Sequence, residues 1–232
     1  MERTAVERYR QSLLGRMIPG VAHEMDNHLS VILGFSELVQ LAAGNEQKVR
    51  EGAAKILAAG EKTGAIIRSF SRHARPHPPA PEAFAPEDMV REMLSFARYD
   101  LCRNNVTVSV QDPVPSGLLR GDRYDLALVL LALLFNGSEA MAATGGELRL
   151  DVRKIDGGWE FAVSDRGSGI PAELEGKVFE EGFTTRDGPI HQGMGLPVAR
   201  HLVGESGGTL ALQSTPGNGC LATVRIPSGS PG

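Results

Sequence analysis

Cysteine is nearly absent from this chain, since Cys102 and Cys220 are its only two in 232 residues. They lie far apart, with no metal-ligand spacing, which argues against a disulfide framework or a zinc site. Long apolar runs are also lacking. The longest, residues 126–135, is too short to cross a bilayer, and the N-terminus has no apolar signal-peptide core. We therefore expect a cytoplasmic protein without membrane insertion.

An excess of positive charge is missing as well. The formal net charge is -4 and the pI is near 5.9, whereas a nucleic-acid-binding protein normally carries a basic face. We therefore expect no nucleic-acid partner. With 41% hydrophobic and 22% charged residues, the chain has the composition of a globular protein with one large or two modest domains.

Residues 2–43 are predicted to form one helix that ends at Gly44-Asn45. Its apolar residues recur at alternating four- and three-residue steps, which is typical of a helix in a bundle. A second helix over residues 46–73 makes an antiparallel hairpin. One hairpin offers too little core, so we expect two chains to pair as a dimeric four-helix bundle. The positions of the apolar face are Leu14, Ile18, Val21, Met25, Ile32, Phe35 and Val39, with His28 beside them.

A second face of the first helix carries His23 and Asn27, one turn apart and pointing toward solvent. Glu24 could accept a proton from one ring nitrogen of His23, which leaves the other nitrogen free to attack an electrophile. The amide of Asn27 could orient a water or a phosphoryl oxygen. Taken alone, such a group is more often an ordinary solvated surface, so its interpretation depends on the rest of the chain.

The proline-rich residues 75–81 separate this all-helical part from one in which strands and helices alternate. This pattern predicts an α/β sandwich, with one sheet and its helices on a single face. The expected helices are residues 87–103, 124–142 and 197–205, and the expected strands are residues 106–110, 148–152, 159–164, 209–213 and 220–226.

Asp165 directly follows the strand that ends at residue 164. A carboxylate there can accept a hydrogen bond from an exocyclic amine such as that of adenine, and Gly167 and Gly169 let the backbone lie close to a flat base. The alternative is an ordinary tight turn. Gly193 and Gly195 precede a helix and so present backbone N–H groups to phosphates.

Two further features fit phosphate chemistry. Asn136 could ligate Mg²⁺ through its amide oxygen, although a capped helix asparagine is an equal alternative. Between the glycine loops, Phe179 and Phe183 could anchor a mobile lid while Arg186 reaches a phosphate. Two core aromatics followed by a loop would explain the phenylalanines equally well.

In order, the chain reads HEMDN, LLFNGSEAM, DRGSGIP, VFEEGFTTR, GMGLPVAR and STPGNGC. Over residues 10–227 it resembles a two-component sensor histidine kinase of the nitrogen-regulation type. Such proteins have a HisKA-type dimerisation and phosphotransfer hairpin followed by a GHKL-type ATPase domain. The resemblance implies a hairpin over residues 1–74, a linker over 75–83 and an ATP-binding domain over 84–228.

The resemblance further implies an ATP-dependent kinase that phosphorylates its own His23 and passes the group to an aspartate of a response regulator. Glu24 would be the general base, and Asn27 would position water for dephosphorylating that partner. ATP and Mg²⁺ are the implied cofactors, with Asn136 as metal ligand and Asp165 recognising adenine. The other implied nucleotide-binding residues are Gly167, Gly169, Phe183, Thr185, Arg186, Gly193, Gly195 and Leu196.

The pattern departs from the family at His28, Ala132, Glu139 and Pro197, where proline, a second asparagine, lysine and a backbone donor are usual. We expect the changes at Ala132, Glu139 and Pro197 to slow autophosphorylation, and the change at His28 to alter the bend that lets the ATPase domain reach His23. No sensor domain fits in the chain, so a separate protein is one expected source of the signal. Two alternatives stay open: a non-catalytic phosphorelay adaptor of the same fold, and a regulator that phosphorylates serine on a bound protein.

Overall fold

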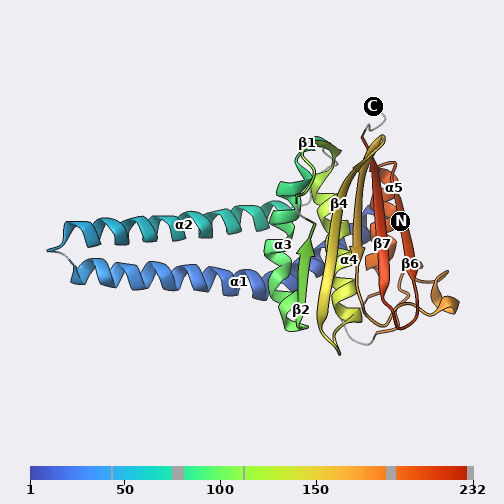
Figure 1. Cartoon of the computed structure of the whole chain (residues 1–232), viewed down its shortest axis with the longest axis horizontal. Helices are drawn as coiled ribbons and strands as arrows, with labels where there is room; N and C mark the ends of the chain where they lie inside the picture. The colour runs from blue at the N-terminus through green and yellow to red at the C-terminus, as the bar shows by residue number, and fades with distance from the viewer. Residues whose placement is uncertain (43, 75–80, 112, 187–191, 229–232) are drawn as a thin grey trace. The chain divides into compact units, whose positions relative to one another are not determined.

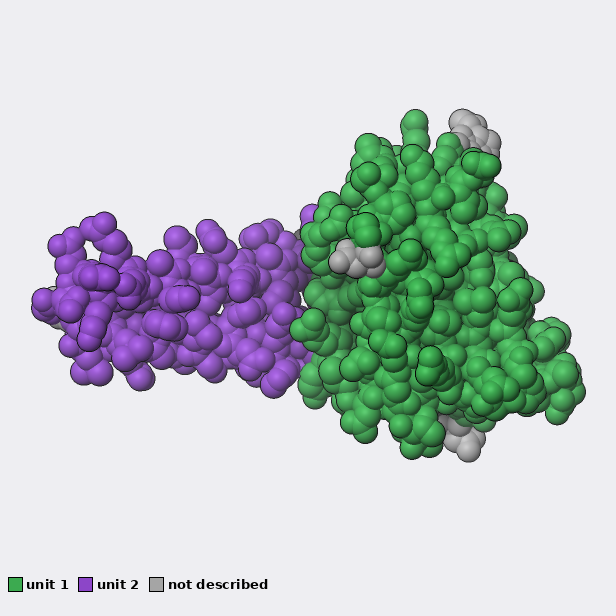
Figure 2. Space-filling model, in the orientation of Figure 1, with its two compact units in different colours: residues 1–16, 77–232 green, residues 17–76 purple. Residues whose placement is uncertain are grey.

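The computed structural model describes residues 1–42, 44–74, 81–111, 113–186 and 192–228. The chain divides into two compact units, coloured separately in Figure 2. Residues 17–76 form the hairpin unit. Residues 1–16 and 77–232 form the sheet unit. Each is described by itself.

The hairpin unit holds most of α1 (Arg3–Leu41) and all of α2 (Glu46–Ala74) (Figure 1). Asn45 caps the N-terminus of α2: its Oδ1 accepts a hydrogen bond 3.0 Å long from the Lys48 backbone N–H. The two helices approach closely at Gly52, where an added Cβ would lie 2.4 Å from Val39 Cγ2. The predicted helix pair is therefore confirmed, whereas its dimeric bundle stays a prediction.

One position of the predicted apolar face differs from expectation. Ile18 is 55% exposed, while Val21 and Met25 are half-buried. Together with Leu29 and Leu33, Ile18 recurs at steps of eleven and four residues. These three therefore follow one stripe along the helix. They remain exposed because one neighbouring helix covers only part of the circumference of α1.

The sheet unit is built on a five-stranded sheet in the order β2-β4-β5-β7-β6. The strands are β2 (Val106–Val110), β4 (Gly146–Ile155), β5 (Gly158–Ser164), β6 (Thr209–Ser214) and β7 (Cys220–Pro227). Only β2 and β4 run parallel; the remaining neighbours are antiparallel. In register, Leu150 faces Val163, and Phe161 faces Val224. All four side chains are buried, so alternate residues of each strand point into one core.

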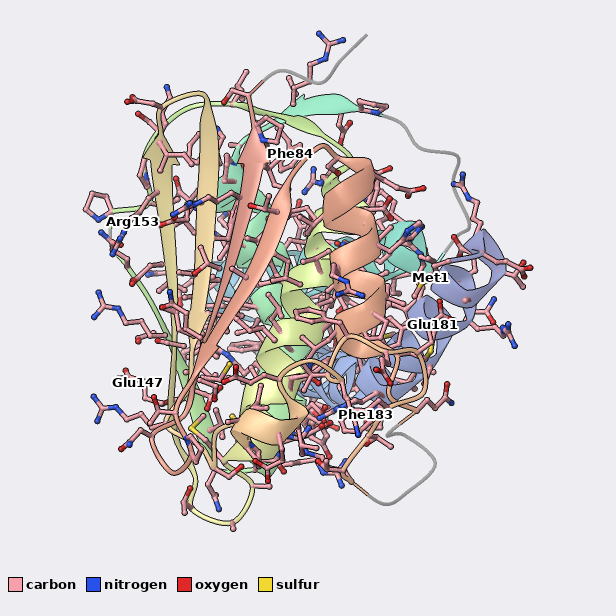
Figure 3. All side chains as sticks on the ribbon, turned by 90° about the vertical axis from the view of Figure 1, so that its right-hand side faces the viewer. Met1, Phe84, Glu147, Arg153, Glu181 and Phe183 are labelled. Carbon is pink, nitrogen blue, oxygen red and sulfur yellow. The ribbon has the colours of Figure 1, made fainter. Side chains whose placement is uncertain are left out.

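Three helices cover that buried face: α3 (Pro86–Arg103), α4 (Arg123–Ala140) and α5 (Gly195–Glu205). Figure 3 shows the sheet along one side of the unit, with α4 and α5 lying against the inward face of the sheet. Asp122 caps the N-terminus of α4: its carboxylate accepts hydrogen bonds from the backbone N–H groups of Tyr124 and Asp125. The α/β sandwich with helices on one face is thus confirmed. A short 3₁₀ helix (Ala172–Leu174) follows β5.

Two short strands, β1 (Glu82–Phe84) and β3 (Leu119–Gly121), pair antiparallel and were not predicted. Since β1 begins at Glu82, it occupies the end of the predicted linker over residues 75–83; residues 75–80 lie outside the described part of the chain. Within the described residues, none of the helices combines the length and apolar character needed to cross a bilayer.

The start of α1 differs from the predicted division of the chain. Residues 1–16 pack with the sheet unit rather than with the hairpin. Arg10 Nη2 lies 2.6 Å from Asp125 Oδ1 of α4, and Val6 and Leu13 are buried. Charge pairing and apolar contact therefore both attach this segment, which we call the N-terminal segment.

Candidate functional site

A cavity of about 260 Å³ opens in the sheet unit between the end of α4, the loop after β5 and the start of α5. It has polar groups from both glycine loops and an apolar wall. The lining residues used below are Tyr9, Ser12, Leu13, Arg16, Asn136, Gly137, Glu139, Asp165, Gly169, Phe183, Thr185, Arg186, Gly193, Gly195, Leu196 and Cys220.

Asp165 lies at the end of β5, and its carboxylate is oriented by the backbone. Oδ1 accepts hydrogen bonds from the N–H groups of Gly167, at 2.8 Å, and Cys220, at 3.2 Å. Oδ2 lies 3.5 Å from the place where a Cβ on Gly137 would stand. Burial raises the pKa of Asp165, although the two backbone donors and Arg186 oppose that shift. The site therefore holds an acceptor in a partly desolvated wall.

Two glycines in the loops leave no room for a side chain. Gly169 has a φ of +68°, and a Cβ there would lie 2.3 Å from the Thr215 carbonyl oxygen. Gly193 has a φ of +63°, and its Cβ would lie 2.4 Å from the Phe183 carbonyl oxygen. Both conformations are ones that L side chains rarely adopt. Glycine is therefore needed here for the backbone to line the cavity.

Asn136 and the start of α5 meet at one end of the cavity. A Cβ on Gly195, the first residue of α5, would lie 3.4 Å from Asn136 Nδ2 and 3.6 Å from its Oδ1. The N-terminus of a helix favours anions, and an amide oxygen beside it suits a hard cation. We call this the phosphate end of the cavity.

A cation there would draw most of its ligands from the nucleotide. Among the described residues, no group of three or more His, Cys, Asp or Glu side chains could hold a metal ion. Mg²⁺ typically binds to one or two side chains and to the phosphates of its substrate. The side-chain amide of Asn136 supplies an oxygen donor of this kind, so the site fits Mg²⁺ carried mainly by phosphates.

Glu139 collects two arginines at the phosphate end. Arg186 Nη1 lies 2.6 Å from Glu139 Oε2, and Arg186 Nη2 donates a 3.3 Å hydrogen bond to the Asn136 carbonyl oxygen. Arg16 of the N-terminal segment also pairs with Glu139. Both carboxylate oxygens of Glu139 are thus paired with guanidinium groups. Arg186, which was expected to contact a phosphate, therefore contacts two residues of α4.

Most predicted nucleotide-binding residues come together in this cavity: Asn136, Asp165, Gly169, Phe183, Thr185, Arg186, Gly193, Gly195 and Leu196. Gly167 does not line it but orients Asp165 through its N–H. The predicted catalytic residues belong to the hairpin unit instead. There His23 and Asn27 are exposed, as expected, and Glu24 is half-buried. The roles of all these residues stay predictions.

The predicted lid is anchored differently from expectation. Phe179 is half-buried rather than in the core, and the Arg200 guanidinium lies 4.5 Å from its ring centroid. Phe183, labelled in Figure 3 on the segment before α5, lines the cavity. Residues 187–191 of the lid lie outside the described part of the chain.

Sequence reasoning missed two groups of residues. Gly137 and Gly219 pack against Asp165: a Cβ on Gly219 would lie 2.0 Å from the Asp165 carbonyl oxygen. A glycine inside a strongly apolar helix was a usable signal for Gly137. The second group comes from the N-terminal segment, where Tyr9 and Arg16 reach the phosphate end. No local pattern marks these two, because their neighbours at the phosphate end lie more than a hundred residues away.

Comparison with known proteins agrees with this geometry. Residues 121–230 match the family described as histidine kinase-, DNA gyrase B-, and HSP90-like ATPase. The sensor protein DivL of Caulobacter vibrioides is 30% identical over 95% of this chain, and the sensor-like histidine kinase SenX3 of Mycobacterium tuberculosis is 26% identical over 91%. The chain is a relative of the two-component sensor histidine kinases. It spans 28% of the length of DivL and 53% of SenX3.

Solved structures of sensor histidine kinases share the fold. The mycobacterial kinase MprB has a TM-score of 0.55 and 24% identity, covering 66% of this chain and all of that structure. The kinase ThkA, solved with the response regulator TrrA, has a TM-score of 0.55 and 22% identity; the match covers 97% of this chain and 64% of that one. The sheet unit thus has the fold of a GHKL-type ATPase domain.

Proposed function

We propose that this chain is an ATP-dependent protein histidine kinase that phosphorylates His23 and transfers the group to an aspartate of a response regulator. The observation that carries the proposal is the convergence of Asp165, the glycine loops and Asn136 on one cavity. A second unit of the same chain presents an exposed histidine. In this proposal residues 1–74 form the phosphotransfer helices, of which residues 1–16 pack with the sheet unit. Residues 75–83 are the linker, into whose end β1 extends, and residues 84–228 are the ATP-binding domain.

Adenine binds at the Asp165 end of the cavity. The Asp165 carboxylate accepts a hydrogen bond from the exocyclic amine, while Gly169 lets the base approach the backbone. The phosphates extend toward Gly193, Gly195 and the start of α5, where backbone N–H groups and the helix dipole favour negative charge. Mg²⁺ on Asn136 would neutralise charge on the phosphates.

Phosphoryl transfer depends mainly on positioning and charge neutralisation. Glu24 accepts the proton of one ring nitrogen of His23, and the lone pair of the other attacks the γ-phosphorus. The bond from that phosphorus to the bridging oxygen breaks, and ADP leaves. A receiver aspartate oxygen then attacks the same phosphorus, the nitrogen–phosphorus bond breaks, and the imidazole is restored. When the protein instead acts as a phosphatase, Asn27 orients the water that hydrolyses the aspartyl phosphate of the response regulator.

The proposed partners are a second copy of the chain, a receiver domain and a separate sensor protein. The stripe formed by Ile18, Leu29 and Leu33 supports the homodimer, because each of these residues is more than 40% exposed. The solved ThkA complex contains a response regulator, which supports a receiver partner here. Since ATP is the donor, we propose that the reaction takes place in the cytoplasm.

Labelling with γ-³²P-ATP tests this function. We expect the purified chain to acquire acid-labile, alkali-stable label that is lost in His23→Gln. His28→Gln is the matched control, because His28 lies half-buried on the apolar face and its loss should leave the label in place. Nucleotide binding without label in the wild type would contradict the kinase, and absence of binding would favour the adaptor. Acid-stable label on a partner serine would favour a serine kinase.

A further inference from the structure

The N-terminal segment forms a wall of the nucleotide cavity that the proposed reaction does not use. Tyr9, Ser12, Leu13 and Arg16 all line the cavity, although they precede its other residues by more than a hundred positions. They approach the phosphate end. The Tyr9 hydroxyl lies 3.1 Å from the place where a Cβ on Gly195 would stand.

This segment is held by charged contacts that lie mostly outside the cavity. Arg10 pairs with Asp125 at the start of α4, at 2.6 Å, and Arg16 pairs with Asp100 of α3. The Arg16 guanidinium also lies 4.2 Å from the centroid of the Phe135 ring. The arginine side chains and Asp100 are largely buried. Removing one partner of such a buried pair leaves an uncompensated charge, so these contacts are costlier to break than exposed ion pairs, which solvent screens.

The same segment engages the groups that the phosphates need. Tyr9 stands beside the first residue of α5, whose backbone N–H would face a phosphate. Arg16 and Arg186 share Glu139, so Arg186 is directed to a carboxylate rather than to the nucleotide. At the other end of the cavity, the Asp165 carboxylate is held by the backbone N–H groups of Gly167 and Cys220.

We propose that the N-terminal segment is an autoinhibitory plug of the phosphate end, and that its release admits the triphosphate. This inference rests on the proposed function. Docking of the segment and binding of the phosphates compete for the start of α5 and for Arg186, whereas the adenosine part binds in both states. A signal that pulls on the start of α1 would thereby change ATP affinity, since Arg10 and Arg16 belong to that helix.

The test compares ATP with adenosine. Asp100→Asn combined with Asp125→Asn removes the charges of the two anchoring carboxylates that do not line the cavity. By isothermal titration calorimetry on the full chain, we expect ATP to bind about tenfold more tightly, within the usual range of coupling between two sites. Adenosine affinity should change less than twofold. Asp88→Asn on α3 is the control, because Asp88 pairs only with exposed Arg91 among the described contacts.

A charge swap gives a second, independent variant in case Asp100→Asn impairs folding. Arg10→Asp should tighten ATP binding, and Arg10→Asp with Asp125→Arg should restore the wild-type affinity. Unchanged or weaker ATP binding in the released variants would overturn the plug while leaving the kinase intact. An equal gain for ATP and adenosine would also overturn it. If no variant and no wild-type protein binds ATP, the proposed function and the plug both fall.

Discussion

The sheet unit buries most of its large apolar side chains, whereas the hairpin unit leaves many of its own in solvent. In the sheet unit, Leu134, Trp159 and Phe161 have no exposed surface. In the hairpin unit, Leu33 is 65% exposed and Leu57 64%. The reason is geometric, since a sheet with a helical layer encloses a core while two helices share only one seam. One unit is complete alone, and the other has surface suited to a second chain.

Truncation of a buried leucine should break the self-sufficient unit. We expect Leu134→Ala to lower the free energy of unfolding by about 2–5 kcal/mol, because it leaves a cavity among closely packed neighbours. Leu33→Ala removes the same atoms from an exposed position and should change the stability of the sheet unit by less than about 0.5 kcal/mol. Urea unfolding followed by Trp159 fluorescence measures both. Equal losses would contradict the difference between the units.

Polar substitution of the hairpin stripe should break the proposed association. We expect Leu29→Ser with Leu33→Ser to weaken the dimer by at least about tenfold, or ~1.4 kcal/mol. The two serines remove apolar surface that dimerisation would otherwise bury. Analytical ultracentrifugation gives the dissociation constant. Leu118→Ser is the matched control: Leu118 is 66% exposed but lies in the sheet unit, so its loss should not alter association. A stripe variant that dimerises normally would show that this surface has another use.

Two glycines of α2 sharpen the description of the hairpin. Gly60 has open space where a Cβ would stand, so Gly60→Ala should stabilise the helix by up to about 1 kcal/mol. Gly52→Ala should lose that gain or destabilise the hairpin, because its Cβ would lie 2.4 Å from Val39 Cγ2. Thermal unfolding by circular dichroism compares the two. Equal stabilisation would mean that the helices do not meet at Gly52.

The partly buried carboxylate of Asp165 in the sheet unit makes nucleotide binding depend on pH. Burial raises the pKa of Asp165, so this group takes up a proton at a higher pH than an exposed aspartate. The proton removes the acceptor for the adenine amine, and ATP affinity should fall two- to tenfold on acidification, about 0.5–1.5 kcal/mol. The stability contributed by Asp165 runs the other way: it is present at low pH and lost as pH rises through the raised pKa.

Affinity measured as a function of pH checks this sign. Asp165→Asn keeps a neutral oxygen acceptor and should bind ATP with little dependence on pH in the acid range. If the wild type and the variant lose affinity in parallel, another group controls the titration.

Much of the fold followed from local patterns. Apolar spacing located α1, α2 and α4 within about two residues, and alternation located the five strands of the main sheet. The strands β1 and β3 escaped prediction because each has three residues, too few for a period, and they form only by pairing across a long separation. The position of Ile18 was misjudged for a related reason: spacing identifies a face but not what covers it.

The residues of the candidate site likewise include some that the sequence predicted and some that it did not. Asp165, Gly169 and Gly193 were predictable because the end of a strand and a glycine-rich loop can each be recognised from a short stretch of sequence. The approach of Tyr9 and Arg16 to the phosphate end was not, since an arginine in a helix has the same local signature whether it meets solvent or Asp100.

The sequence by itself therefore determined the longer helices and the strands of the main sheet and indicated the candidate site residues, because periodicity and turn chemistry act between near neighbours in the chain. The tertiary structure alone decided that residues 1–16 join the sheet unit and that Arg186 pairs with Glu139. Those outcomes depend on charge pairing and burial between residues far apart in sequence, which no local pattern encodes.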